Sequence, residues 1–288
     1  MRALEPCGSF SASDNFLKPM DPVPAIDQGE FKVSKEELDY CKLYKRRENL
    51  DQIGSMSHVS EELWMLVVDW LMQVHNATEL AEGILYRTIN IFGRYVSQSV
   101  NVIESNEVFQ LGFTSMVLAS KYEDISDSKL EELLSRFPKP NEIELIWGKE
   151  SLIVEKLHWD FTAPNAYHFL ALFIKVGTSY KKMEDMVFFL AELGLMHYGV
   201  IVMRLPSMFA ASALYAARCT LREVPVWNET LERLTGYSES NIKELAKLMV
   251  RFHSEAANQN LKAVYNKYSD QKWSSVAFCE PAKDLLED

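Results

Sequence analysis

Apolar side chains recur at intervals of three and four residues along most of the chain, a pattern typical of amphipathic helices. The pattern begins at Ser34, where Ser34 and Glu37 have the spacing of a helix-capping box. Tyr40, Leu43 and Tyr44 then fall on one face of the expected helix. Because no strand-like alternation of useful length follows, the sequence predicts an all-α fold.

The later helical segments form two similar series that meet near Ala163-Pro164. The first series is expected at residues 60–75, 80–98, 104–124 and 128–137, and from Pro140 to near residue 158. The second is expected at residues 165–176 and 180–203, from Pro206 to residue 219, and at residues 228–234 and 238–258. The pattern therefore predicts two units of five helices each.

Changes in composition divide the chain into five parts. Residues 1–30 contain Ser, Pro, Asp and Gly with little periodicity, which predicts a disordered tail. The other parts are an N-terminal helix and polar linker at 31–59, the first unit at 60–162, the second unit at 163–260, and a C-terminal helix and tail at 261–288.

The third helix of each unit carries small side chains on several sides. They are Gly112, Ser115, Ala119 and Ser120 in the first unit, and Ala210, Ala211, Ser212, Ala213, Ala216 and Ala217 in the second. Small side chains let neighbouring helices approach closely, so we expect each third helix to be central. Large residues such as Phe209 and Leu214 surround the alanines, which argues against a solvent-exposed helix.

Composition and charge exclude several classes of function. The net charge of −11 at pH 7 disfavours nucleic acid as the main ligand. The most apolar segment, residues 186–203, is interrupted by Glu192 and His197, so we interpret it as a core helix and expect no membrane span. The four cysteines form no C-x-x-C pair, which fits a reducing nuclear or cytoplasmic location.

Signals of catalysis are missing from the sequence. It contains no Gly-rich phosphate loop and no nucleophile elbow, and none of its six histidines has metal-ligand spacing. We therefore expect no catalytic residues, no metal and no cofactor, and we expect the protein not to be an enzyme.

Several motifs, taken in order, resemble the cyclin family. The run Val-Val-Asp-Trp-Leu at residues 67–71 is similar to the opening motif of the cyclin box, and Leu-Ala-Ser-Lys-Tyr-Glu-Asp at residues 118–124 is similar to the signature of its third helix. Residues 206–218 and 227–237 resemble the second cyclin fold of plant B-type cyclins. The resemblance covers about residues 31–283.

The resemblance implies two tandem five-helix cyclin boxes and a regulatory role. Cyclins bind a cyclin-dependent Ser/Thr protein kinase and hold it in its active arrangement, and a B-type cyclin does so in G2/M control of cell division. The alternative is a degenerate cyclin-fold adaptor that binds partners without activating a kinase. A DNA-binding module of cyclin fold is disfavoured by the acidic charge.

The resemblance also implies a kinase-binding surface. Its centre is an ion pair between Lys121 and Glu150 that hydrogen-bonds to the kinase backbone. The other positions that match kinase contacts are Leu118, Tyr122, Glu123, Trp159 and Phe161, with Tyr40, Leu43 and Tyr44 of the N-terminal helix. Core packing is an alternative role for Leu118, and packing on the cyclin's own body is an alternative for the N-terminal helix.

A second implied surface is a substrate-docking groove for Arg-x-Leu peptides of substrates or inhibitors. The residues at its positions are Leu63, Leu66, Val67, Trp70 and Gln73. The family usually has an acidic residue where this chain has Gln73, so we expect weaker recognition of the peptide arginine. Ordinary core packing is the alternative for the apolar members.

The chain departs from the family pattern at three places. Trp64 stands where an Arg is usual, Gly93 stands where its Asp partner is usual, and residues 138–147 differ before the helix that bears Glu150. Losing both members of a charged pair costs far less than losing one, so we expect the fold to survive. Arg47 and Leu50 loosely match a degradation motif, which would add the ubiquitin-ligase machinery as a partner.

Overall fold

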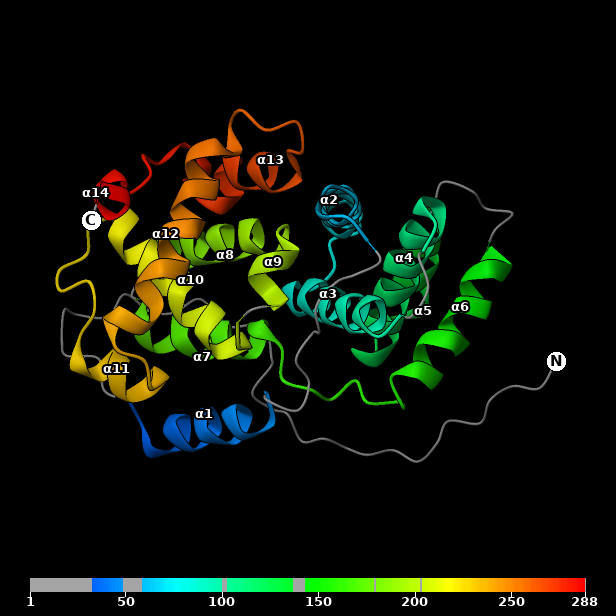
Figure 1. Ribbon diagram of the computed structural model, residues 1–288, viewed down its shortest axis with the longest axis horizontal. Helices are drawn as coiled ribbons and strands as arrows, with labels where there is room; N and C mark the ends of the chain where they lie inside the picture. The colour runs from blue at the N-terminus through cyan, green and yellow to red at the C-terminus, as the bar shows by residue number, and fades with distance from the viewer. Residues whose placement is uncertain are drawn as a thin grey trace. The chain divides into compact units, whose positions relative to one another are not determined.

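The regular structure of this chain is helical wherever the structure describes it (Figure 1). The computed structural model describes residues 33–48, 59–99, 103–136, 143–178, 180–202 and 204–287. The predicted tail at residues 1–30 and the linker residues 49–58 lie outside these ranges. None of the described helices is long and apolar enough to cross a membrane.

The first unit is built around α4, as its small residues predict. Its helices are α2 (Glu61–Ala77), α3 (Glu82–Ser97), α4 (Ser105–Tyr122), α5 (Asp127–Ser135) and α6 (Ile143–Lys156). Helix α4 contacts the other four. A Cβ atom on Gly112 would lie 2.9 Å from Val67 Cγ1, so the absence of a side chain there permits the close approach of α2 and α4.

The second unit is arranged around α10 in the same way (Figure 1). Its helices are α7 (Ala166–Gly177), α8 (Lys181–Leu195), α9 (Tyr198–Val202), α10 (Pro206–Thr220), α11 (Glu229–Thr235) and α12 (Glu239–Ala256). Helix α10 contacts α7, α8, α11 and α12, and its alanines are buried. The predicted start of α12 is confirmed, because Ser238 and Asn241 form a capping box.

The prediction of one helix over residues 180–203 is wrong, because α8 ends at Leu195 and α9 begins at Tyr198. The backbone turns there, with the His197 amide donating to the Gly194 carbonyl at 3.1 Å. The Trp64 indole donates to the Leu195 carbonyl at 3.2 Å. Contacts from another unit therefore stabilise a break that the local hydrophobic pattern does not reveal.

Helix α1 (Lys35–Glu48) packs on α7, α10 and α11 of the second unit. The predicted box of Ser34 and Glu37 is present in both directions, at 2.9 and 3.2 Å. At the other end of the helix, the Glu48 carboxylate accepts hydrogen bonds from the Ser207 amide at 2.9 Å and the Ser207 hydroxyl at 2.8 Å. Glu48 therefore caps α10 from outside the unit.

The C-terminal segment contains α13 (Ala263–Ser269), η2 (Gln271–Trp273), η3 (Val276–Phe278) and α14 (Lys283–Glu287). Helix α13 contacts both α2 and α8. The Ala263 amide donates to Asp69 of α2 at 2.8 Å, and the Lys267 amine lies 2.6 Å from Glu192 of α8. These bonds tie residues of the two units to one helix.

Candidate functional site

Lys121 and Glu150 are in contact, as the family resemblance implies. The Lys121 ammonium lies 2.8 Å from each carboxylate oxygen of Glu150. Lys121 is in the last turn of α4, where the helix dipole favours a cation, and Glu150 is on α6. Both side chains remain partly exposed, so a partner has access to the pair.

Aromatic side chains flank this ion pair. Tyr122 is 45% exposed, and Trp147 of α6 is 40% exposed. The Lys121 ammonium lies 4.6 Å from the centre of the Trp147 ring, within cation–π range. The sequence did not predict Trp147, although its position three residues before Glu150 places both on one face of α6.

The linker between the two units, residues 157–162, carries two more of the predicted residues. Trp159 is 74% exposed, whereas Phe161 is half-buried and packs on the core. His158 and Trp159 have φ angles of +52° and +60°, the left-handed conformation that side chains disfavour. The linker therefore makes a tight turn that directs the Trp159 side chain outward.

Leu118 and the residues of α1 divide between the surface and the core. Leu118 is buried, so its contribution to a binding surface is small. Leu43 is 51% exposed. Tyr44 packs edge-on against His168 and Phe169, with ring centroids 5.2 and 6.0 Å apart. The alternative of packing on the chain's own body thus applies to Tyr44 and not to Leu43.

Tyr40 and Glu123 also have neighbours within the chain. The Tyr40 ring centroid lies 6.3 Å from that of Tyr44, and the Tyr40 side chain is half-buried. The Glu123 carboxylate accepts a hydrogen bond from Arg87 Nε at 2.7 Å. Both side chains thus border the predicted kinase-binding surface while contacting the chain's own residues.

The predicted docking groove follows α2, and its residues differ in accessibility. Leu66 is 47% exposed, and Leu63 and Trp70 are half-buried. Val67 is fully buried against α4, so its assignment to the groove surface is corrected: it supports the groove from beneath. Gln73 is exposed, and its amide donates to the Asp69 carboxylate at 2.7 Å.

The departure at Trp64 lies in the core. Its indole stacks on Phe92 with an interplanar angle of 8°, and it packs edge-on against Tyr198 with ring centroids 4.9 Å apart. Trp64 and Gly93 are both buried. A buried aromatic cluster therefore occupies the place of the usual charged pair.

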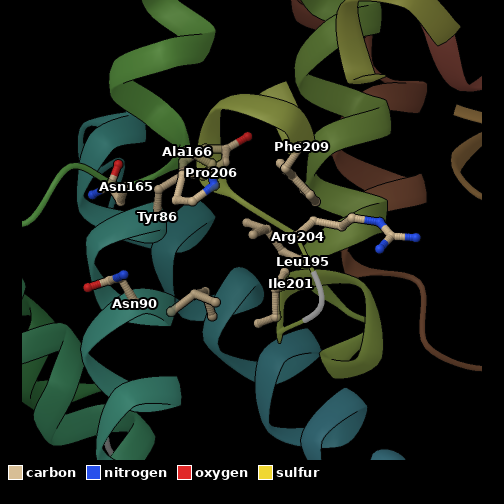
Figure 2. A pocket seen from close by; sticks show the side chains of 10 residues that line it. Tyr86, Asn90, Asn165, Ala166, Leu195, Ile201, Arg204, Pro206 and Phe209 are labelled. Atoms are coloured by element: carbon tan, nitrogen blue, oxygen red, sulfur yellow. The ribbon is translucent and has the colours of Figure 1, made fainter. Parts of the chain in front are cut away.

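The apolar cavity in Figure 2 lies where residues of both units meet. It is lined by Tyr86 and Asn90 of α3 and by residues near α7 to α10, and Arg204 extends its guanidinium away from the other labelled side chains. Its volume of about 50 Å³ is far below that of a ligand pocket, about 300–1,000 Å³. In the described residues, no three His, Cys, Asp or Glu side chains gather as metal ligands.

Two family descriptions match the chain. "Cyclin, N-terminal domain" matches residues 37–162, and "Cyclin, C-terminal domain" matches residues 164–282. The matched ranges contain the two helical units and all but the first two residues of α1.

Curated relatives are similar over most of the chain. The G2/mitotic-specific cyclin S13-7 of Glycine max is 40% identical over 253 residues, which cover 86% of this chain and 97% of the relative. The G2/mitotic-specific cyclin-1 of Antirrhinum majus is 40% identical over 96% of this chain and 60% of its own length. Cyclin-B1-2 of Arabidopsis thaliana is 39% identical over 86% of this chain and 56% of its own length. The chain thus spans nearly all of the first relative and less than two thirds of the other two.

Solved structures share the fold. A viral cyclin from herpesvirus saimiri aligns with a TM-score of 0.60 at 18% identity, covering 86% of this chain and 99% of that one. A chain of the yeast RNA polymerase II CTD kinase complex CTDK-1 aligns with a TM-score of 0.58 at 15% identity, covering 90% of this chain and 82% of that one.

Proposed function

The chain belongs to the cyclin family, and we propose that it binds and activates a cyclin-dependent Ser/Thr protein kinase in G2/M control of the cell cycle. As a cyclin, it acts as a regulatory subunit and performs no chemistry of its own. The kinase is the partner that follows from family membership, whereas docking peptides and the ubiquitin-ligase machinery are further proposals.

Activation requires a rigid surface that distinguishes two states of the kinase. A kinase is active when the Glu of its αC helix pairs with the Lys of strand β3. A cyclin that binds only that arrangement shifts the equilibrium by its differential affinity, and a shift from 1:99 to 99:1 needs about 10⁴-fold. Packed helices provide such a surface, because they cannot deform to fit both states.

The observation that carries the proposal is the Lys121–Glu150 pair with its aromatic border. Two carboxylate oxygens orient the Lys121 ammonium, which has three N–H donors and retains one for a partner carbonyl. Exposed Tyr122, Trp147 and Trp159 supply the kind of aromatic anchors that dominate binding energy. The partner segment that fits is apolar with an accessible backbone carbonyl.

The Trp64 substitution favours activation over the adaptor alternative. It is absorbed by core packing with Phe92 and Tyr198, and none of these three side chains lies on the proposed binding surface. The departure from the family pattern therefore leaves the exposed ion pair in place.

The test is reconstitution with a purified cyclin-dependent kinase. Binding is measured by calorimetry and activation by substrate phosphorylation, for the unmodified chain and for Lys121→Glu, Glu150→Lys and the double swap. Each single reversal should abolish kinase binding, because it places two like charges side by side at positions 121 and 150. The double swap restores the internal pair, and only partial recovery is expected if the Lys121 ammonium also donates to the kinase.

The matched control is Lys149→Glu, which reverses a second ion pair between α4 and α6. The Lys149 amine lies 2.8 Å from Glu107, at the other end of α4. Its reversal should change kinase affinity by no more than about twofold. If the unmodified chain binds no cyclin-dependent kinase, the proposal is rejected, and binding without activation favours the adaptor.

Nuclear and cytoplasmic location and turnover complete the proposal. A fluorescent fusion followed through division tests the location. For turnover, Arg47 is at the end of α1, where its guanidinium donates to the Thr162 hydroxyl at 2.9 Å, and Leu50 lies outside the described residues. Loss of ubiquitination in Arg47→Ala would support a degradation signal, and an unchanged half-life would exclude it.

A further inference from the structure

Arg87 of α3 contacts three residues of the predicted kinase-binding surface at once. Its Nε donates to the Glu123 carboxylate at 2.7 Å, and its Nη1 donates to the Phe161 carbonyl at 2.5 Å. Its guanidinium carbon lies 4.2 Å from the centre of the Tyr122 ring. The side chain is itself buried, so it contacts these residues from beneath.

A second arginine of α3 holds the same linker. Arg94, two turns after Arg87, donates from Nη1 to the Asp160 carbonyl at 2.8 Å. These bonds fall immediately after His158 and Trp159, whose φ angles are +52° and +60°. Residues in disfavoured conformations persist only where their surroundings fix them. The two arginines therefore fix the turn from which Trp159 extends into solvent.

We propose that Arg87 is the positioning residue of the kinase-binding surface. It joins the end of α4, which carries Lys121, Tyr122 and Glu123, to the linker that carries Trp159 and Phe161. This inference rests on the proposed function and names the residue that orders its surface. Without Arg87, the kinase would have to order the linker on binding, and that cost would lower its affinity.

An arginine suits this task better than a lysine. Its planar group can donate in two directions while its face stacks on an aromatic ring, whereas an ammonium is a single point of charge. Arg87→Lys should therefore retain the pairing with Glu123 and lose the bond to the Phe161 carbonyl or the stacking on Tyr122. Arg87→Met keeps an unbranched stem, shorter than that of arginine, and removes every donor.

The experiment compares Arg87→Met and Arg87→Lys with Arg218→Met in the full chain. Arg218 is a buried arginine of the second unit that donates at 2.8 Å to three backbone carbonyls, those of Gly177, Pro225 and Val226. Its loss should lower stability to a similar degree without touching the proposed surface. Affinity for a purified cyclin-dependent kinase is measured together with amide hydrogen exchange over residues 121–124 and 157–162.

Arg87→Met should weaken kinase affinity about tenfold and speed exchange in both segments, Arg87→Lys should be intermediate, and Arg218→Met should stay within about twofold. Equal losses of affinity in Arg87→Met and Arg218→Met would overturn the inference, because a general loss of stability would then explain both. If the unmodified chain binds no kinase, the proposed function fails separately. Unchanged amide hydrogen exchange in Arg87→Met would reject the positioning role whether or not the unmodified chain binds a kinase.

Discussion

The indole of Trp64 lies almost parallel to the ring of Phe92, with centroids 4.8 Å apart and an interplanar angle of 8°. The same indole donates to the Leu195 carbonyl and contacts Tyr198 edge-on. Trp64 and Phe92 belong to α2 and α3, whereas the other two residues belong to the second unit. A residue that departs from the family pattern therefore links the two units through one hydrogen bond and one aromatic contact.

Trp64→Arg, which restores the usual family residue alone, should strongly destabilise the fold. The site is fully buried, and Gly93 offers no carboxylate to pair with the guanidinium. An unpaired buried charge of this kind costs about 3–5 kcal/mol of folding free energy. Urea unfolding measures the change, and Trp159→Arg at the exposed linker is the control, expected within about 0.5 kcal/mol of the unmodified chain.

The double variant Trp64→Arg/Gly93→Asp tests why the two departures occur together. If the aromatic cluster replaces a charged pair, the double variant should be more stable than the sum of the two single changes implies. Additive effects would show that Trp64 and Gly93 are unrelated substitutions.

The fold was predictable where its signals are local. The capping boxes at Ser34 and Ser238 and the small residues of α4 and α10 lie within single helices, so periodicity and spacing reveal them. The break between α8 and α9 depends on Trp64, which is 131 positions away from Leu195. No local pattern contains that contact, which explains why one continuous helix was expected.

The site was predictable only in part, for a related reason. Lys121 and Glu150 are 29 positions apart, and the family resemblance, not their spacing, indicated the pair. Arg87 contacts Glu123 and Phe161, which are 36 and 74 positions away. In the sequence it is one polar residue in an amphipathic helix, and only tertiary structure brings it under the surface.

Substitutions at two adjacent residues of α1 should separate an effect on kinase binding from an effect on stability. Leu43→Ala removes an exposed side chain, so it should change the free energy of unfolding by less than about 0.5 kcal/mol. Tyr44→Ala removes a ring packed on His168 and Phe169 and should cost about 2 kcal/mol. Thermal or urea unfolding measures both changes.

If α1 contacts the kinase, Leu43→Ala should also weaken kinase affinity several-fold, by calorimetry with the full chain. The two variants share a helix and the same new residue, so helix propensity is matched between them. Unchanged affinity in Leu43→Ala would remove Leu43 from the proposed binding surface, while α1 would keep its structural role on the second unit.

Gln73→Glu should strengthen the binding of an Arg-x-Leu peptide to the α2 groove. Asp69 nearby is buried and accepts bonds from Gln73 and from the Ala263 amide; Gln73→Glu removes the first bond and leaves the second. A carboxylate at position 73 would pair with the peptide arginine and raise affinity about fivefold. Peptide titration measures this gain, and a peptide with Lys in place of Arg should gain less.

Leu66→Ala is the complementary change in the same groove. Leu66 is exposed, so its truncation should remove peptide binding without a measurable loss of stability. Equal peptide affinity for Gln73→Glu, Leu66→Ala and the unmodified chain would exclude this surface as a docking groove.

The stability of the fold should depend on pH through Glu192. This side chain of α8 is fully buried, and its carboxylate accepts bonds from the Lys267 amine at 2.6 Å and the Tyr268 hydroxyl at 2.7 Å. Burial raises the pKa of Glu192 to about 7. Burial disfavours the charged form of Lys267, but Glu192 and Glu82 lie beside its amine and raise the Lys267 pKa. Lys267 therefore stays charged in the same pH range.

A raised carboxyl pKa means that the folded chain binds this proton more tightly than the unfolded chain does. Proton binding at Glu192 therefore contributes fully to the free energy of unfolding below about pH 4.5, and this contribution is lost as pH rises through about 7. Relative to Glu192→Gln, which does not titrate, the unmodified chain should lose up to about 1.4 kcal/mol per pH unit across that window. Urea unfolding at several pH values measures the difference, with exposed Glu244→Gln as the control. Parallel plots of unfolding free energy against pH for the unmodified chain and Glu192→Gln would contradict the prediction, because Glu192 would then have the same pKa in the folded and unfolded chain.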